Sequence, residues 1–147
     1  MKLKGAQISF VLLKGDQKLM NAFDPKLTAL QFNEYINRQD LQGLSSLMSE
    51  DHVFIDRKGK EDRGKETMIE GWKRFFQAFP AYLNTFLRVQ SEGNLVVLYG
   101  YATWHQGSDP DYAIWTARIV NDLVAEWRIY EDTEENKKLF NLISPAR

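Results

Sequence analysis

A short segment of alternating residues holds the clearest candidate for chemistry in this sequence. His52, Phe54 and Asp56 are separated by single residues, so on an extended strand they share one face. A carboxylate beside apolar surface can act as a general base, because such a setting raises its pKa toward neutrality. Asp56 is therefore the first catalytic candidate. The alternative is a solvated carboxylate at a strand end, with its pKa held low by Arg57 and Arg63.

The sequence contains two histidines, His52 and His105, and either could form an acid/base couple with Asp56. Both could equally be partly buried residues without a chemical role, since histidine is commonly intermediate in burial. No ligand-spacing motif joins these three residues, so no metal site is predicted. The absence of cysteine excludes disulfides, thiol nucleophiles and cysteine metal sites.

A second set of polar side chains lies on the segment 95–106, which alternates as a long strand does. Its odd-numbered residues include Val97, Tyr99, Tyr101, Thr103 and His105. Its even-numbered residues include Val96, Leu98, Gly100, Ala102 and Trp104. We expect the odd-numbered face to line a ligand pocket, because polar groups on bulky rings converge there. The hydroxyl groups of Tyr99 and Tyr101 could then orient an oxygen atom of a bound molecule.

Three helices are expected to position these segments. Asp24 is a suitable N-cap for the first helix, and Pro25 fits its first position. Asp40 caps a second, short helix, which residues 49–51 end. A third helix is expected over 65–79, before a proline. The apolar stripe of this third helix consists of Met68, Ile69, Trp72, Phe75, Phe76 and Phe79.

Strand-like alternation replaces helical spacing after the third helix. Strands are expected at 52–56, 82–91, 95–106, 112–120 and 123–132, with a loop over 57–64 and a short closing helix over 134–142. The two-residue link at 121–122 is typical of a tight hairpin. This order predicts an α+β fold: a cone-shaped, half-open barrel in which a curved, mostly antiparallel sheet wraps around the N-terminal helices. A pocket for a small apolar organic molecule would lie at the open end.

Aromatic residues make up 13% of the sequence, enough to fill a core and to line part of a pocket. Trp72, Phe76, Trp115 and Trp127 would more often be core than ligand contacts, but cone geometry favours a mixed role. The outward positions of the last strand carry Glu126, Arg128, Tyr130 and Asp132. Such a polar convex face suits solvent or a twofold dimer contact.

Length and charge limit the classes of function. The 147 residues suit one domain; we assign 25–147 to the cone and 1–24 to an N-terminal extension with a candidate extra strand. The formal net charge of −1 favours neither nucleic acid nor an anionic membrane as a partner. The apolar run 8–13 is too short for a signal peptide or a membrane span, so we expect a cytoplasmic protein. No phosphate-binding motif occurs, and no cofactor is predicted.

Several segments resemble known families. Residues 40–44 and 51–56 resemble the start of nuclear-transport-factor-2-like domains. A further set of segments resembles the SnoaL-like polyketide cyclase branch: residues 63–66, Trp72, 75–76, 79–80, 84–86 and 126–130. The resemblance covers residues 25–142 and implies the cone fold and a homodimer. It also implies membership of a superfamily that includes cyclases, isomerases, epoxide hydrolases, dehydratases, transport adaptors and non-catalytic binders, so fold alone does not decide function.

Comparison with the ketosteroid isomerase branch places the general base at Asp56, at the end of the first strand. In that branch a tyrosine and a protonated aspartate stabilise the oxyanion. The resemblance places these two roles at Phe32 and Trp115, and neither can donate as those groups do. Tyr35 lies nearly one turn along the helix from Phe32 and could substitute.

In the cyclase and epoxide hydrolase branches, an acid on the last strand transfers the proton. The resemblance places that acid closest to Ile129. Glu131 lies two residues further on the same face and could substitute, whereas Asp132 points the other way on a regular strand. These departures weaken both activities that the resemblance implies.

Three functions fit these residues. The first is a cofactor-independent isomerase, cyclase or lyase, in which Asp56 removes a proton next to a carbonyl group and His105, Tyr101 or Tyr35 stabilises the oxyanion. The second is a non-catalytic binder or carrier of an apolar small molecule. The third is a dimeric interaction module that uses the convex sheet face. The residues expected to contact a ligand are Phe32, Tyr35, Phe54, Trp72, Phe76, Tyr99, Tyr101, Trp115, Trp127 and Glu131.

Overall fold

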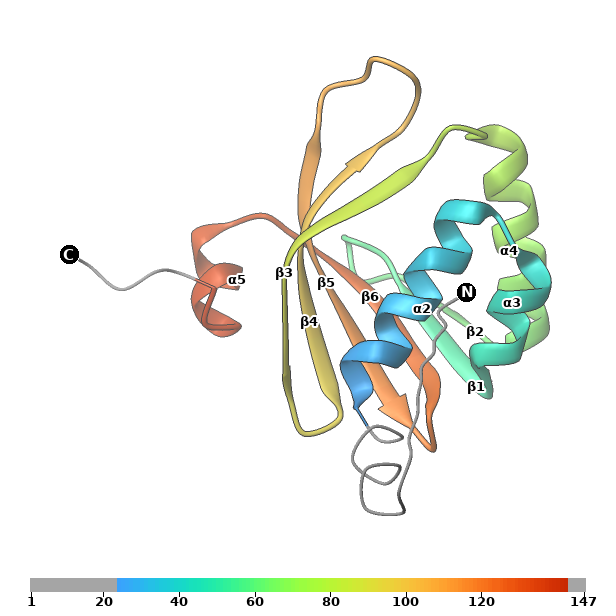
Figure 1. Cartoon of the computed structure of the whole chain (residues 1–147), viewed down its shortest axis with the longest axis horizontal. Helices are drawn as coiled ribbons and strands as arrows, with labels where there is room; N and C mark the ends of the chain where they lie inside the picture. Colours follow the sequence, from blue (N-terminus) through green and yellow to red (C-terminus); the bar gives the residue numbers. More distant parts are fainter. Residues whose placement is uncertain (1–23, 143–147) are drawn as a thin grey trace, which may run out of the picture.

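The computed structural model of the protein describes residues 24–142 (Figure 1). Its elements, in chain order, are α2 (Pro25–Arg38), α3 (Leu41–Leu47), β1 (Met48–Ile55), β2 (Glu61–Arg63), α4 (Lys65–Ala78), β3 (Leu83–Glu92), β4 (Leu95–Thr103), β5 (Asp111–Val120), β6 (Leu123–Glu131) and α5 (Glu134–Leu139). The extra strand expected within residues 1–24 lies outside the described residues. Within the described part of the chain, no helix is long and apolar enough to cross a membrane.

The two N-terminal helices begin where the sequence predicts, because an aspartate caps each of them. Asp24 Oδ1 accepts a hydrogen bond from Lys26 N at 3.0 Å, and Pro25 opens α2. Asp40 Oδ1 accepts from Gly43 N at 2.9 Å at the start of α3. These bonds satisfy backbone amides that the first helical turn leaves unpaired. The helical pair that precedes the sheet is therefore encoded locally.

The strands form one six-stranded sheet in the order β2-β1-β6-β5-β4-β3. β1 and β6 run parallel, and the other neighbouring pairs are antiparallel. Asn121 and Asp122 join β5 to β6 with φ angles of 52° and 62°, as a type I′ hairpin turn requires. The predicted mostly antiparallel sheet and its hairpin are confirmed.

Two boundaries near β1 differ from the prediction. The strand begins at Met48 rather than at His52, because Met48 pairs with Val124 of β6 and residues 49–51 continue the strand. The loop expected over 57–64 contains β2, which pairs with β1. The three residues of β2 are charged and exposed, so they show none of the apolar alternation that marks a half-buried strand.

The sheet curves around the helices α2, α3 and α4, which lie on one side of it (Figure 1). The pairing of β3 with β4 shifts between Phe86 and Arg88, which marks a bulge. Opposite the bulge, Gly100 lies so close to Thr85 that a Cβ atom would overlap the Thr85 backbone. The two strands therefore bend where a glycine permits close approach. The predicted α+β cone with a curved sheet is confirmed.

The core lies between the helices and the inner face of the sheet. Its fully buried large side chains include Phe32, Ile36, Leu98, Trp115 and Trp127. The ring centroids of Phe32 and Trp127 are 4.9 Å apart, so α2 packs directly on β6. Helix and sheet therefore bury a shared aromatic layer.

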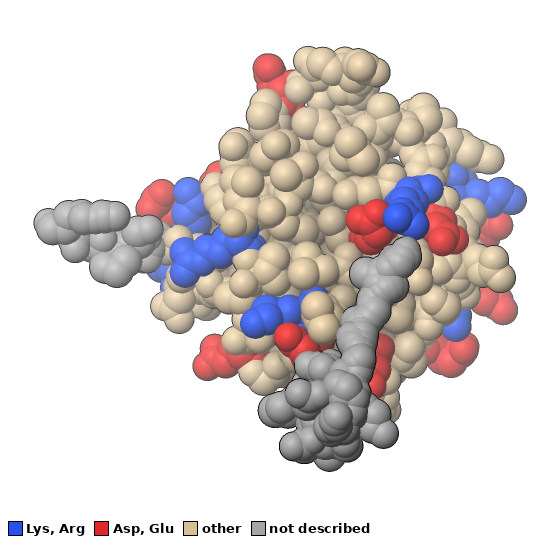
Figure 2. All heavy atoms as spheres, viewed as in Figure 1, with Lys and Arg blue, Asp and Glu red and all other residues tan. Residues whose placement is uncertain are grey.

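Charged side chains of both signs intermingle on the face shown in Figure 2. Basic side chains there lie beside acidic ones, and a broad uncharged area separates the groups. This distribution agrees with the formal net charge of −1.

Candidate functional site

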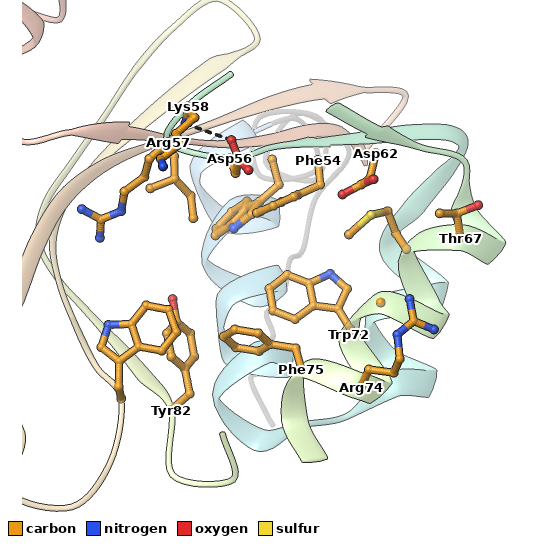
Figure 3. A pocket seen from close by; sticks show the side chains of 15 residues that line it. Phe54, Asp56, Arg57, Lys58, Asp62, Thr67, Trp72, Arg74, Phe75 and Tyr82 are labelled. Atoms are coloured by element: carbon orange, nitrogen blue, oxygen red, sulfur yellow. Dashed lines mark hydrogen bonds between the residues drawn. The ribbon is translucent and has the colours of Figure 1, made fainter. Parts of the chain in front are cut away.

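A cavity of about 460 Å³ lies between α4 and the inner face of the sheet (Figure 3). Ligand sites in proteins commonly have volumes of about 300–1,000 Å³. Its aromatic lining consists of Phe54, Trp72, Phe75, Tyr82, Trp104 and Trp127. Its charged lining consists of Asp56, Arg57, Lys58, Asp62 and Arg74. The cavity is an apolar hollow with ionic groups on part of its wall, large enough for a small organic molecule.

The aromatic side chains of the wall pack edge to face and hold one another in place. The Tyr82 ring centroid lies 4.8 Å from that of Phe75, with the planes at 84°, and 4.9 Å from that of Trp104, at 67°. Phe75 meets Trp72 at 5.6 Å and 87°. Such contacts stabilise aromatic pairs beyond their buried area. The wall includes the sequence-predicted candidates Phe54, Trp72 and Trp127.

Helix α4 supplies one side of the cavity because its aromatic residues recur at helical spacing. Trp72 and Phe75 are three residues apart, and both line the cavity. Phe76 packs in the core, with its ring 5.5 Å from that of Trp72, and does not line the cavity. Gly71 also lines the cavity and, without a side chain, leaves space there.

Asp56 follows β1 and lines the cavity, as does Phe54 on the same strand face. Asp56 Oδ1 accepts hydrogen bonds from Lys58 N at 2.9 Å and from Lys60 N at 3.0 Å. The Lys60 hydrogen bond is the largest cause of a lowered Asp56 pKa; desolvation opposes it, and the Lys58 amide adds to it. The turn after β1 therefore keeps this carboxylate ionised.

The two arginines expected to lower the Asp56 pKa have other partners. Arg57 Nη2 binds Asp111 Oδ2 at 2.9 Å, and Arg57 Nη1 binds Glu131 Oε1 at 3.2 Å. Arg63 binds a glutamate two residues before it at 3.0 Å. The low pKa that the alternative interpretation expected is thus found, but its cause is the backbone.

Arg57 and Asp111 form part of a clamp at the edge of the cavity. Trp104 Nε1 donates a hydrogen bond at 3.0 Å to Asp111 Oδ2, the oxygen that also binds Arg57. The clamp joins the turn after β1 to the start of β5 and, through Glu131, to the end of β6. Two carboxylates therefore compensate the charge of the Arg57 guanidinium.

The sequence model of the SnoaL-like domain matches residues 29–134, which is most of the chain. The chain belongs to the SnoaL-like domain family. The resemblance inferred from its motifs is confirmed. A search among curated proteins finds no match.

Solved structures similar to this SnoaL-like domain include proteins of several descriptions. An uncharacterized cystatin fold protein from Novosphingobium aromaticivorans has a TM-score of 0.67 and 20% identity, over 74% of this chain and 99% of that one. An NTF2-like protein of unknown function from Cytophaga hutchinsonii has a TM-score of 0.63 and 14% identity, over 80% and 95%. An LEH-like epoxide hydrolase from M. tuberculosis has a TM-score of 0.64 and 14% identity, over 74% and 82%. At these identities the similarity shows the fold alone.

Three positions that the family resemblance assigned to proton transfer or oxyanion binding carry other chemistry in this SnoaL-like domain. Phe32 and Trp115 are fully buried in the core and do not line the cavity. Ile129 does line the cavity, but its side chain has no exchangeable proton.

The two proposed substitutes lie outside the cavity lining. The Tyr35 ring packs over Gly43 of α3, where it would overlap any Cβ atom, so it joins two helices. Glu131 is exposed and binds Arg57, as described above. Glu131 therefore contacts the cavity-lining residue Arg57 but does not itself line the cavity.

Neither histidine lines the cavity beside Asp56. His52 is fully buried; its Nδ1 donates to Val124 O at 2.6 Å, and its ring lies 5.7 Å from that of Phe32. Burial is the largest cause of its lowered pKa, so the ring stays neutral at neutral pH. His105 lies in the exposed turn after β4. The structure therefore does not bring a histidine and Asp56 together in the cavity.

The expectation that the odd-numbered face of β4 lines the cavity is wrong. The even-numbered residues face the core, and Trp104 at the end of this series lines the cavity. Tyr99 and Tyr101 lie on the outer face, with their rings 6.0 and 5.3 Å from that of Tyr112. The reason is steric, because Gly100 belongs on the inner side, where β3 approaches.

Sequence reasoning missed Tyr82, Trp104 and Arg57 as cavity residues. Tyr82 alternates with Asn84 and Phe86, which both face inward, so a period-two pattern could have found it. Trp104 likewise continues the apolar even-numbered series of β4. Arg57 is positioned by carboxylates on β5 and β6, far along the chain, and no local pattern indicates that.

Proposed function

We propose that this SnoaL-like domain binds an apolar small organic molecule in the cavity beside α4. The observation that carries the proposal is the aromatic lining of a hollow of about 460 Å³. Apolar surface that faces water is unfavourable by about 25 cal/mol per Å² relative to buried surface. A ligand that covers this wall removes that penalty, and the edge-to-face packing presents the wall already formed.

The groups around the cavity favour binding over chemistry. A general base works best when its pKa is near the operating pH, and the pKa of Asp56 is lowered instead. Phe32, Trp115 and Ile129 occupy the positions from which the resemblance expects an acid or an oxyanion donor. A non-catalytic binder or carrier is therefore the function that the geometry supports best.

Native mass spectrometry tests this proposal. The freshly purified protein should carry the additional mass of a retained small molecule, or should gain the mass of tetralin when tetralin is added. A Gly71→Leu side chain would project into the cavity, so this variant should lose the bound mass. Lys73→Leu is the matched control, because Lys73 is exposed on the same helix and does not line the cavity. Equal binding by the wild type and by Gly71→Leu would contradict the proposal.

A second candidate function is proton transfer by Asp56. The observation that favours it is that the Asp56 carboxylate lines the same cavity, while its two backbone hydrogen bonds both go to Oδ1. Oδ2 could then take a proton from a carbon next to a carbonyl group. The electron pair of the C–H bond would pass into an enolate, and a proton from solvent would return to that carbon.

Deuterium exchange into 2-tetralone, followed by NMR in D₂O, separates this candidate from binding alone. Catalysis predicts that the wild type accelerates exchange and that Asp56→Asn removes the acceleration. Asp62→Asn is the matched control, because Asp62 is a second carboxylate in the cavity lining. Equal exchange with the wild type and Asp56→Asn would rule out the catalytic role and leave binding intact.

A further inference from the structure

Tyr82 brings a hydroxyl group to the aromatic wall of the cavity. Figure 3 shows the residue on the wall opposite Asp56, with its hydroxyl group directed into the cavity toward Arg57. The remaining aromatic lining presents ring carbons and indole groups. Thr67 also lines the cavity, but Tyr82 places its hydroxyl group among the aromatic rings, and this position suggests a role in selecting the ligand.

The position of the Tyr82 hydroxyl group is fixed by packing. Phe75 and Trp104 hold the ring at centroid distances of 4.8 and 4.9 Å, and the residue is only 5% exposed. A donor held in this way loses little conformational entropy when it forms a hydrogen bond. The ring therefore presents its hydroxyl group at a defined point of the cavity.

The Tyr82 hydroxyl group also keeps its proton. Burial is the largest cause of a strongly raised Tyr82 pKa, and the negative charge of Asp111 adds to it. The positive charge of Arg57 and a hydrogen bond with the Asn84 side chain offset part of this effect. The group is consequently a hydrogen-bond donor throughout the neutral pH range.

The charges near this hydroxyl group disfavour an anionic ligand atom. Arg57 is the nearby cation, and Asp111 and Glu131 already bind both of its terminal nitrogens. A carboxylate on the ligand would meet a compensated cation and the Asp111 carboxylate in a partly dry site. An uncharged acceptor oxygen carries no charge for Asp111 to repel, and it can accept the Tyr82 hydrogen bond without the cost of burying an ion.

We propose that the Tyr82 hydroxyl group donates a hydrogen bond to an uncharged oxygen of the bound molecule, which selects ketones and similar carbonyl compounds over hydrocarbons of the same shape. This inference rests on the proposed binding function of the same cavity. It adds that the ligand is not purely apolar and that Tyr82 is the residue that recognises its oxygen.

The test compares 2-tetralone with tetralin, which has the same ring skeleton without the oxygen, by NMR titration of the full chain. The wild type should bind the ketone more tightly, and Tyr82→Phe should weaken ketone binding by roughly two- to tenfold, the usual worth of one neutral hydrogen bond. Tetralin affinity should stay unchanged in the same variant. Tyr101→Phe removes a hydroxyl group from the outer face of β4 and should leave both affinities unchanged.

The outcomes separate this inference from the function on which it rests. If Tyr82→Phe binds both compounds as the wild type does, the assignment of Tyr82 is overturned and binding in the cavity stands. If both affinities fall together, Tyr82 acts only as packing and the inference is overturned in the same way. If the wild type binds neither compound, the proposed function is overturned and the inference falls with it.

Discussion

Arg57 binds Asp111 at 2.9 Å and thereby ties the turn after β1 to the start of β5. The same carboxylate oxygen accepts the indole N–H of Trp104, so an ion pair at the cavity edge also orients a residue of the aromatic wall. Arg57 and Asp111 are 54 residues apart in the sequence, so their ion pair forms only when the sheet is complete. The edge of the cavity is therefore a product of the tertiary fold.

Replacement of Arg57 should weaken the fold modestly. Arg57→Gln removes two ion pairs whose side chains are partly exposed, so solvent screening limits the loss to about 1 kcal/mol of unfolding free energy. Urea denaturation measures this loss. Arg63→Gln is the control, because its ion pair is fully on the surface and its removal should change stability by less than about 0.5 kcal/mol. An equal loss of unfolding free energy in the two variants would show that the ion pairs of Arg57 do not stabilise the fold more than a surface ion pair does.

His52 should make stability depend on pH below neutrality. Its pKa in the folded protein is lowered from 6.5, so below that pH the unfolded chain takes up a proton that the folded protein resists. Stability is therefore fully present above pH 6.5 and falls as pH decreases, by at most about 1.4 kcal/mol per pH unit. The lowered pKa of Asp56 acts with the same sign, but only below its ordinary value of 3.8.

Thermal unfolding measured between pH 7 and pH 5 tests this prediction. His52→Gln should flatten the profile over this range, and His105→Gln should keep it, because His105 is exposed. A wild-type profile that is already flat would contradict the assignment of His52 as a buried neutral ring.

Gly100 should tolerate no side chain. Gly100→Ala would drive a methyl group into the Thr85 backbone and should destabilise the fold by about 3 kcal/mol or more. Gly71→Ala should be neutral or stabilising by up to about 1 kcal/mol, because Gly71 lies in α4 and an added Cβ would meet only Met68 Cε, at an ordinary contact distance of 3.9 Å. Chemical denaturation of both variants measures the difference. Similar stability of the two variants would mean that the close approach of β3 and β4 is not required for the curved sheet.

The outer face of the sheet is the surface we propose for a homodimer. Tyr112 is 39% exposed there, and Tyr101 packs against it. Tyr112→Glu should shift the protein from dimer to monomer in sedimentation velocity, since a buried unpaired charge opposes association. Glu135→Ala, which alters an exposed residue of α5, should leave the state unchanged. A wild type that is monomeric at high concentration would overturn the proposal.

The sequence predicts features that short-range patterns encode. The caps at Asp24 and Asp40, the aromatic stripe of α4 and the hairpin at residues 121–122 each depend on neighbouring residues. The position of Asp56 after a strand is likewise readable from the alternation of His52 and Phe54 before it. Such patterns were sufficient for the fold class and for one charged residue of the cavity.

The remaining features depend on contacts between distant segments. Polarity alone predicts the wrong inner face for β4, because the approach of β3 at Gly100 decides which face turns inward. The pKa of Asp56 depends on the turn geometry that brings Lys60 N within 3.0 Å, and a list of nearby charges does not reveal that geometry. The partners of Arg57 are Asp111 on β5 and Glu131 on β6. The sequence does not reveal how these strands are placed relative to β1.

The four tryptophans allow the most direct test of the binding cavity. Trp72, Trp104 and Trp127 line it, whereas Trp115 is buried in the core. A titration with tetralin, followed through the indole N–H signals in a ¹H–¹⁵N spectrum, should shift the first three signals in a saturable manner and leave that of Trp115 in place. If saturating ligand moves none of the three cavity signals, or moves only that of Trp115, the cavity is not the binding site.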